Sequence, residues 1–366
     1  MSHNDADNGM SSKPADAADE HDDTRKWSEL KPLPEGSRWS HSCCAIDEHR
    51  MIIIGGINAT WNAVSSGLIY DSRTRQMTPL PNDMPAARAE SRAVANAENM
   101  YVIGGWGAGS RNAVYRLSLE TYEWTVMAPM STVRYDCAVV LKGDYIYVFG
   151  GSGRDGNSLA LTERYSIIDN TWQPLPDMAK VRRCHCALVL DNDIYIVGDY
   201  RSCFDIFDIV SLSWRTEGNL HDLPEMRDYS AAIVLRDRYL VVIGGQFYTK
   251  KGFGHAANCF IYDRIFNRWS STPMSMDMVT TRFKHTVAVL GEKIIVVGGR
   301  GGNFGKPLSS MEFIEAHDLL EYSPLNYPLP HSYFNKILQI VKANGEGCID
   351  DGVNNASPPK RLKHES

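Results

Sequence analysis

A short run of β-branched and aliphatic residues that ends in a pair of glycines recurs six times along this chain of 366 residues. The first copy is Met51-Ile-Ile-Ile-Gly-Gly56 and the last is Lys293-Ile-Ile-Val-Val-Gly-Gly299. The copies between them end at Gly105, Gly151, Asp199 and Gly245, so neighbouring copies lie about 50 residues apart. Such a period means that one supersecondary unit is repeated and packed against its own copies, and this limits the folds open to the chain.

An aromatic residue and then a tryptophan follow most of the glycine pairs. The clearest pairs are Tyr165 with Trp172, Phe207 with Trp214, and Tyr262 with Trp269. The β-branched runs predict buried strands, and a glycine pair allows positive φ and close approach of a neighbouring backbone. The large rings are suited to filling the space between adjacent sheets. Because one four-stranded sheet cannot bury both of its faces alone, the pattern favours a closed ring of sheets.

This pattern covers roughly residues 27 to 315 and resembles the kelch repeat, whose fold is a β-propeller. We therefore predict an all-β, six-bladed kelch-type propeller over residues 27–316. The segment from Trp27 to Pro34 looks like the end of a unit that has no beginning, while the sixth unit lacks a tryptophan after Phe313. The N-terminal strand around Trp27 is thus expected to close the ring, with closure through residues 320–324 as the alternative.

The segments outside the repeats have a different composition. Residues 1–26 are acidic and nearly free of apolar side chains, which predicts a disordered acidic tail. Residues 317–345 form an extension in which Phe334, Ile337, Leu338 and Val341 have the spacing of a short helix. Residues 346–366 predict a second disordered tail. It ends in a basic cluster, Lys360, Arg361 and Lys363, which is either a nuclear import signal or a chance match.

Composition excludes several classes of protein. A formal net charge of −6 argues against a general nucleic-acid binder, and no apolar stretch is long enough to cross a membrane. No signal-peptide pattern opens the chain. The eight cysteines include no CxxC pair, so free thiols in a reducing compartment are expected. We predict a cytoplasmic protein, or a nuclear one if the basic cluster is an import signal.

One arginine stands at a similar distance before each glycine pair. The six residues are Arg38, Arg88, Arg134, Arg183, Arg227 and Arg282. One interpretation is structural, because a guanidinium has five donors that can tie one blade to the next. The other follows from the resemblance, which implies that arginines at this position in kelch peptide receptors hold acidic side chains of a bound turn. A ring of positive charge would suit a carboxylate-rich partner.

The loops after the glycine pairs are expected at the same mouth of the channel as these arginines. Their candidate partner-binding aromatics are Trp61, Trp106, Tyr200, Phe247 and Tyr248. Their basic residues are Arg111, Arg154, Arg201, Lys250, Lys251, Arg300 and Lys306. The fourth loop is very short and the fifth is the longest, so a ligand is expected to bind off-centre. The small polar residues that peptide receptors carry before the third strand are only partly kept, as at Ser66, Asn258 and Ser309.

Other motifs carry no chemistry. Gly151–Gly156 spells GxGxxG, but a strand pattern follows it where a dinucleotide site needs a helix. Three residues after the arginines stand His41, Ser91, Cys137, Cys186, Ser230 and His285. The cysteines and the histidines are expected on different sides of the ring, too far apart for one tetrahedral metal site. We predict no metal and no cofactor.

The resemblance implies a protein–protein interaction module without catalysis. It also suggests a substrate receptor in ubiquitin ligation, a role of kelch proteins that carry BTB or F-box segments. The alternative is a carbohydrate-processing propeller of the sialic-acid mutarotase type, which is similar in size. Glu90, Asp136 and Asp228 would be its candidate acids and bases, although salt bridges to the ring arginines are the simpler interpretation of these carboxylates.

Overall fold

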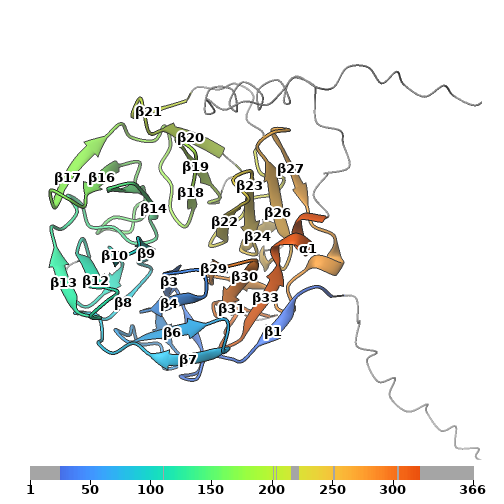
Figure 1. Cartoon of the computed structure of the whole chain (residues 1–366). Coiled ribbons are helices and arrows are strands. Elements are labelled where there is room, and N and C mark those ends of the chain that lie inside the picture. The colour runs from blue at the N-terminus through green and yellow to red at the C-terminus, as the bar shows by residue number, and fades with distance from the viewer. Residues whose placement is uncertain are drawn as a thin grey trace, which may run out of the picture. The chain divides into compact units, whose positions relative to one another are not determined.

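The computed structural model describes residues 25–321, except 110, 201, 203, 216–221, 250–251 and 303–304. The chain divides into two compact units, Met1–Pro324 and Leu325–Ser366, and all described residues belong to the first. In the described part, six four-stranded antiparallel sheets follow one another around a ring (Figure 1). The predicted all-β propeller is confirmed. Residues 1–24, the helix predicted within 317–345, the tail 346–366 with Lys360, Arg361 and Lys363, and also Arg201, Lys250 and Lys251 lie outside the described residues.

Each of the first five blades is built from four strands of one repeat. Blade 1 contains β3 (Ser42–Ala45), β4 (Arg50–Ile54), β6 (Gly67–Asp71) and β7 (Gln76–Pro79). Blade 2 contains β9 (Arg92–Ala95), β10 (Asn99–Ile103), β12 (Val114–Ser118) and β13 (Trp124–Met127). Blade 3 contains β14 (Ala138–Lys142), β15 (Tyr145–Phe149), β16 (Thr162–Ser166) and β17 (Thr171–Leu175). Blade 4 contains β18 (Cys186–Leu190), β19 (Asp193–Val197), β20 (Phe204–Asp208) and β21 (Ser213–Trp214). Blade 5 contains β22 (Ala231–Leu235), β23 (Tyr239–Ile243), β26 (Cys259–Asp263) and β27 (Arg268–Ser271).

The sixth blade joins the two ends of the ring. It contains β29 (Thr286–Leu290), β30 (Lys293–Val297), β33 (Met311–Glu315) and, as its outer strand, β1 (Ser28–Leu30). Strand β1 pairs with β33, and Ser28 lies opposite Phe313. Trp27 is buried just before β1, and its indole Nε1 donates to the Met276 carbonyl at 2.9 Å. The N-terminal strand therefore closes the ring as predicted. Ala316–Glu321 form helix α1, so residues 320 and 321 do not supply the alternative closing strand.

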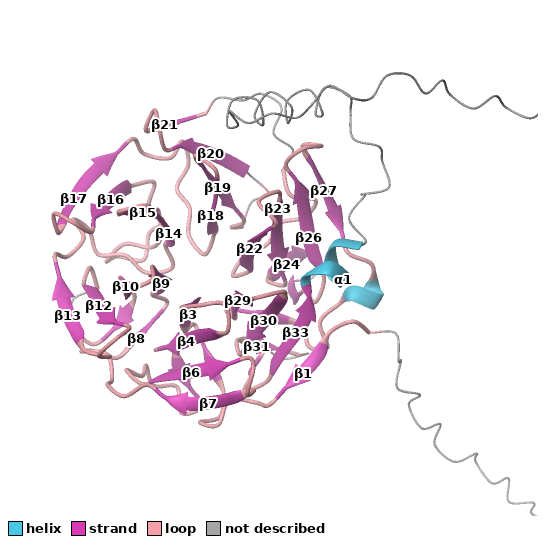
Figure 2. Ribbon diagram, viewed as in Figure 1, coloured by secondary structure: helices cyan, strands magenta, loops and turns pink. Residues whose placement is uncertain are grey.

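Smaller elements extend from the ends of the blades (Figure 2). They are the ribbons β2 (Arg38–Trp39) with β5 (Ile57–Asn58), β8 (Arg88–Ala89) with β11 (Trp106–Gly107), β24 (Gln246–Thr249) with β25 (Gly252–His255), and β28 (Arg282–Phe283) with β31 (Arg300–Gly301) and β32 (Lys306–Pro307). A 3-10 turn, η1, spans Met274–Met276. No helix in the described part is both long and apolar enough to span a membrane. The cysteines Cys43, Cys44, Cys137, Cys184, Cys186 and Cys259 are free thiols.

The hydrophobic core lies between neighbouring blades. One cluster combines Phe149 of blade 3 with Ile194 and Phe207 of blade 4. The Trp214 ring packs edge-on against Phe207 at 5.1 Å, and its Nε1 donates to the Pro176 carbonyl at 2.9 Å. Trp124 and Trp172 likewise donate to carbonyls of the blade before their own, as expected for a large ring with one polar group.

The glycine pairs and the arginines of the repeats are joined by hydrogen bonds within and between blades. The first glycine has a positive φ, and a Cβ on Gly104 would lie 2.5 Å from the Arg134 carbonyl oxygen of the next blade. The second glycine, Gly105, donates its N–H to that same carbonyl at 2.9 Å. The Arg134 guanidinium in turn donates to the carbonyl of Gly150, the first glycine of its own blade, at 3.2 Å. Arg88, Arg182 and Arg282 link two successive glycine pairs in the same way, which explains why the two features repeat together.

The same bonds correct the position of the fourth arginine. Arg182, not Arg183, donates to the Gly198 carbonyl at 3.2 Å and accepts from the Gly151 N–H at 2.8 Å. Arg182 is 1% exposed, whereas Arg183 lies on the surface and reaches the Gly156 carbonyl at 3.4 Å. Arg88, Arg134, Arg182 and Arg282 all bond a glycine 16 positions later, and Arg183 does not keep this spacing. The prediction of Arg183 as the repeat arginine was wrong by one residue.

Candidate functional site

The repeat arginines are buried inside the blades and do not line an open mouth. Their exposed fractions are 3% for Arg38, 0% for Arg88, 1% for Arg134, 1% for Arg182, 2% for Arg227 and 0% for Arg282. Five of them pair with carboxylates: Arg38 with Glu35, Arg134 with Glu163, Arg182 with Asp205, Arg227 with Glu225, and Arg282 with Glu312. Arg88 instead donates to the Tyr115 hydroxyl at 2.9 Å. Burial with internal partners supports the structural interpretation of these residues.

The polar residues before the third strands serve the same internal purpose. Ser66 accepts two hydrogen bonds from Arg38, through its carbonyl at 3.0 Å and its hydroxyl at 2.9 Å. The Asn258 side chain accepts from Arg227 at 2.8 Å. These residues orient buried guanidinium groups, so their side chains are already engaged within the blade.

Two residues after each repeat arginine, six residues form a closed ring around the channel. They are Ser40, Glu90, Asp136, Cys184, Tyr229 and Lys284, and all have φ between 51° and 58°. Each donates its backbone N–H to the carbonyl of the ring member in the neighbouring blade, at 2.8 to 3.2 Å. Left-handed backbone costs a non-glycine residue roughly 1 kcal/mol, and the six bonds, which run in one direction around the ring, offset this cost. We call this ring the throat.

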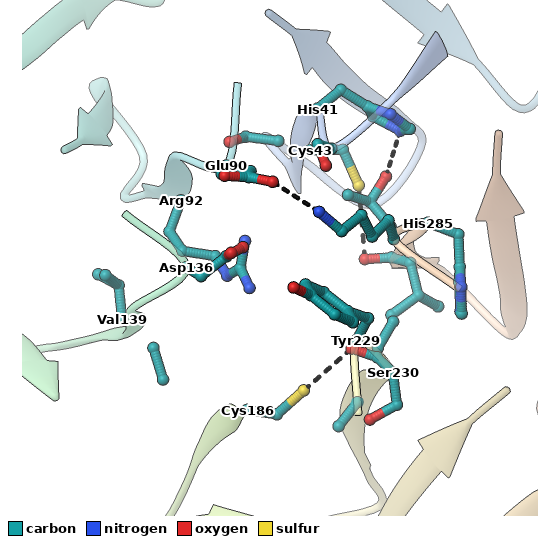
Figure 3. Close-up of a pocket in the computed structure, with 18 of the residues that line it drawn as sticks. His41, Cys43, Glu90, Arg92, Asp136, Val139, Cys186, Tyr229, Ser230 and His285 are labelled. Atoms are coloured by element: carbon teal, nitrogen blue, oxygen red, sulfur yellow. Dashed lines mark hydrogen bonds and ion pairs between the residues drawn. The ribbon is translucent and has the colours of Figure 1, made fainter. Parts of the chain in front are cut away.

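The throat opens into a channel cavity of about 160 Å³ and carries most of the channel's charge (Figure 3). Lys284 of blade 6 donates to Glu90 of blade 2 at 2.6 Å, an ion pair between residues separated by 194 positions. Arg92 and Asp136 face the same space. Asp228, just before Tyr229 of the throat, accepts from the Tyr248 hydroxyl at 3.2 Å. The expected salt bridges from Glu90, Asp136 and Asp228 to the repeat arginines are therefore not formed.

The Asp136 carboxyl is a group in the throat whose ionisation changes on folding within the ordinary pH range. Burial and the nearby Glu90 carboxylate raise its pKa to about 7, against the opposing effect of Lys284 and Arg92. Asp228 follows the same direction, since burial raises its pKa to about 6. A raised folded pKa means that the folded protein holds a proton that the unfolded chain has released between about pH 4 and pH 7.

Asp136 and Asp228 therefore make the free energy of unfolding fall as the pH rises from about 4 to 7, while the buried neutral His41 and His285, with pKa values lowered to about 3, make it rise up to about pH 6.5. Replacing Asp136 by asparagine should remove the Asp136 part of the decrease, so the stability of the variant should gain on that of wild type by on the order of 2 kcal/mol between pH 4 and 7. The measurement is urea unfolding across this range for the wild-type protein and Asp136→Asn, with Asp155→Asn as an exposed control. Parallel pH profiles for wild type and Asp136→Asn would contradict the assignment.

The histidines of the channel are packing residues in this structure. Three positions after the repeat arginines stand His41, Ser91, Cys137, His185, Ser230 and His285, so His185 replaces the Cys186 predicted from Arg183. Burial lowers the pKa of both His41 and His285 to about 3, so they are neutral at ordinary pH. A Cβ on Gly244 would lie 3.0 Å from the His285 ring, which fits tightly against the neighbouring blade. No group of three potential ligands for a metal exists among the described residues.

Exposed aromatic residues gather where the glycine-pair loops emerge, an end of the ring that we call the loop face. Trp61, Trp106, Tyr200, Tyr248 and Phe253 are between 36% and 64% exposed. Trp61 packs edge-on against Trp39 at 5.5 Å, and the Arg300 guanidinium lies 5.2 Å from the Trp61 ring centroid. Phe247 is less accessible and contacts Arg227 at 5.4 Å. The hairpin β24–β25 in blade 5 supplies Tyr248 and Phe253 and the loop of blade 1 supplies Trp61, while Trp106 and Tyr200 belong to blades 2 and 4.

Sequence reasoning did not single out three residues of this surface. Arg300 was counted among the basic residues of the loops, while Phe253 and His255 of β25 received no role. His255 stacks on Phe283 at 4.4 Å, and Phe253 lies next to it at 5.9 Å. A usable signal was present in the composition of the fifth loop, which contains three aromatic residues and a histidine over Phe247–His255.

The fold and the loop face define a repeat propeller that presents its glycine-pair loops at one end. Residues 16–199 of the chain match the family model described as the KLHDC2/KLHL20/DRC7 Kelch-repeats domain. The chain belongs to the kelch-repeat family. Its members are typically interaction domains without catalysis, so the protein is a kelch-repeat protein-interaction module.

Relatives of known sequence agree with this assignment. Kelch-like protein 38 from Mus musculus is 25% identical over 258 residues, which cover 68% of this chain and 42% of that protein. The F-box/kelch-repeat protein At1g26930 from Arabidopsis thaliana is 25% identical over 255 residues, covering 63% of this chain and 58% of that protein. The chain therefore spans less than two thirds of the length of either relative.

Proposed function

We propose that the loop face binds a partner protein, off-centre, over blades 5, 6 and 1. The observation that carries this proposal is the set of exposed aromatic side chains on these loops, of which Trp61 is 59% and Phe253 64% exposed. Large apolar groups that are clustered and exposed are typical of interaction sites, and tryptophan and tyrosine dominate the binding free energy of many interfaces. The bound segment is proposed to be a peptide with acidic groups, because the Arg300 guanidinium lies 5.2 Å from the Trp61 ring centroid on this surface.

The partner list of cells is the direct test. We expect that replacing Trp61, Tyr248 and Phe253 by alanine together removes most specific partners from an affinity purification with the full chain. Each such aromatic contributes about 1 to 2 kcal/mol or more at an interface, so the loss should exceed tenfold. The measurement is quantitative mass spectrometry of proteins bound to wild type and variant.

A matched control lies at the opposite end of the sheets. Ile168 and Val210 are 74% and 75% exposed in the turns between the third and fourth strands of blades 3 and 4. Consecutive antiparallel strands alternate in direction, so these turns point away from the loop face. Ile168→Ser with Val210→Ser should leave the partner list unchanged. If this control lost the partners and the loop-face variant kept them, the proposed surface would be the wrong one.

Two more specific functions are proposed from the name of a relative and from the basic cluster near the C-terminus. We propose a substrate receptor in ubiquitin ligation, since one relative's name joins an F-box to kelch repeats. This role assigns substrate selection to the loop face. Nuclear import through Lys360, Arg361 and Lys363 is proposed on their composition alone. The sugar-processing alternative is less favoured: Asp136 lies in the channel, but Lys284 already engages the neighbouring Glu90 carboxylate.

A further inference from the structure

We infer that Arg300, and not a repeat arginine, binds an acidic side chain of the partner. An apolar residue of the partner, next to that acidic residue, packs on Trp61. This inference rests on the proposed function and specifies the chemistry of the same surface. The repeat arginines are buried, and most of them already hold a carboxylate of their own blade. Arg300 differs from them in each of these respects.

Three aromatic rings hold the Arg300 guanidinium in place. Its central carbon lies 5.1 Å from the ring centroid of Trp39, 5.2 Å from that of Trp61 and 5.6 Å from that of Phe283. Its Nε donates to the Gly305 carbonyl at 2.7 Å. Cation–π contacts and this bond fix the plane of the guanidinium. Its two terminal nitrogens bond no other described residue, so they remain for a bidentate acceptor.

The charge of Arg300 has no counter-ion in the described part of the chain. Burial lowers the pKa of Arg300, and no nearby carboxylate acts to raise it. An arginine nevertheless stays protonated, so a partly desolvated cation is left without a partner. A carboxylate that arrives here meets a donor that is already oriented and partly dehydrated. Both features increase the free energy gained on binding.

The neighbouring Trp61 is held rigidly and offers an apolar surface beside the cation. Its φ is +63°, and its N–H donates to the Asn58 carbonyl at 3.0 Å. The Asn58 side chain accepts from the backbone N–H groups of Thr60 and Asn62 at 3.1 and 3.0 Å, which closes the loop on itself. A pre-ordered aromatic loses little entropy when a ligand packs on it.

The charge balance selects the class of anion. Lys284 lies 5.4 Å from the Trp39 ring centroid on the channel side, but Glu90 neutralises it at 2.6 Å. The subsite therefore presents the Arg300 guanidinium beside Trp61, with the exposed Lys306 on the adjoining strand β32. The planar fork of a guanidinium matches a carboxylate in a bidentate arrangement. The fitting ligand is an aspartate or glutamate side chain next to an apolar or aromatic residue.

Selection of peptides by the full chain tests this inference. A library of short peptides displayed without a free carboxyl terminus should yield binders in which an acidic residue adjoins an apolar one. For the recovered peptides, made with amidated ends, Arg300→Met should weaken binding by about 10- to 100-fold. Arg300→Lys should be intermediate because it keeps the charge but loses the fork. The matched control Arg154→Met removes an equal charge from an exposed loop of blade 3 and should leave affinity within about twofold.

A double-mutant comparison decides where the carboxylate binds. Changing the peptide's acidic residue to its amide should cost affinity with wild type and almost none with Arg300→Met. If the cost were equal in both, or if Arg300→Met bound normally while Trp61→Ala did not, the role of Arg300 would be overturned and the loop-face function would stand. If no peptide were recovered, or if neither variant weakened binding, the role of Arg300 and the loop-face function would both be contradicted. Thermal unfolding of every variant checks that the fold is intact.

Discussion

Glu312→Gln should lower the free energy of unfolding by about 3 to 5 kcal/mol, because it leaves the Arg282 guanidinium charged and unpaired inside blade 6. Both side chains are 0% exposed, and Arg282 Nη2 lies 2.5 Å from Glu312 Oε1. The same carboxylate also accepts from the backbone N–H groups of Val279 and Thr280, at 2.7 and 3.0 Å. Its removal therefore disturbs the segment that leads into the sixth repeat as well as the ion pair. Urea denaturation monitored by tryptophan fluorescence measures the effect.

Two comparison variants isolate burial as the cause. Glu225 pairs with Arg227 in blade 5 but is 46% exposed, so Glu225→Gln should cost only about 1 kcal/mol. The double variant Arg282→Met with Glu312→Leu removes both charges and should be more stable than Glu312→Gln. Equal losses for Glu312→Gln and Glu225→Gln would mean that burial does not set the strength of these pairs.

Trp27→Ala should be comparably destabilising, by about 3 to 5 kcal/mol, because it opens a cavity at the point where the ring closes. Trp27 is 3% exposed and packs in one cluster with Ile294, Ile314 and Leu319. It also anchors β1, a strand of three residues that comes from the opposite end of the repeats to complete blade 6. Losing the anchor should weaken the closure of the ring as well as the local packing. The midpoint of urea unfolding and the rate of proteolysis near β1 would both report it.

A second tryptophan provides the matched control. Trp172 donates its Nε1 to the Ala128 carbonyl at 2.9 Å, the same length as the bond from Trp27 to Met276, but it is only partly buried. Its strand is continuous with the rest of blade 3. Trp172→Ala should therefore cost less, about 2 kcal/mol. An equal or larger loss for Trp172→Ala would show that ring closure adds nothing to the importance of Trp27.

The choice between Arg182 and Arg183 as the repeat arginine could not be made from approximate spacing in the sequence. Two adjacent arginines fit the repeat almost equally well by spacing, and a strand turns a one-residue shift into a change of face. The buried bond from Arg182 to the Gly198 carbonyl, separated by the same 16 positions as in blades 2, 3 and 6, resolves the choice. Local spacing, measured against the other repeats more strictly, would have identified it.

Side-chain partners across the ring could not be predicted in this way. The Lys284–Glu90 pair joins residues of blades 6 and 2, and Ser40 of blade 1 lies between them in the throat. The sequence of neither repeat identifies Lys284 and Glu90 as partners, because the two side chains meet only when the ring closes. The expectation that Glu90 would bond a repeat arginine failed because those guanidinium groups point into the blades and are already engaged.

The amino-acid sequence by itself determined the propeller, the number of its blades and the strand that closes it. Glycine pairs, β-branched runs and spaced tryptophans are local requirements of each blade, and they recur wherever a blade recurs. The tertiary structure alone decided which arginines are buried and which cation faces a partner. Trp39 belongs to the first repeat, whereas Phe283 and Arg300 belong to the sixth, so the three residues meet only when blade 6 closes against blade 1. Burial and charge compensation arise only from these tertiary contacts, so no single segment of the sequence determines them.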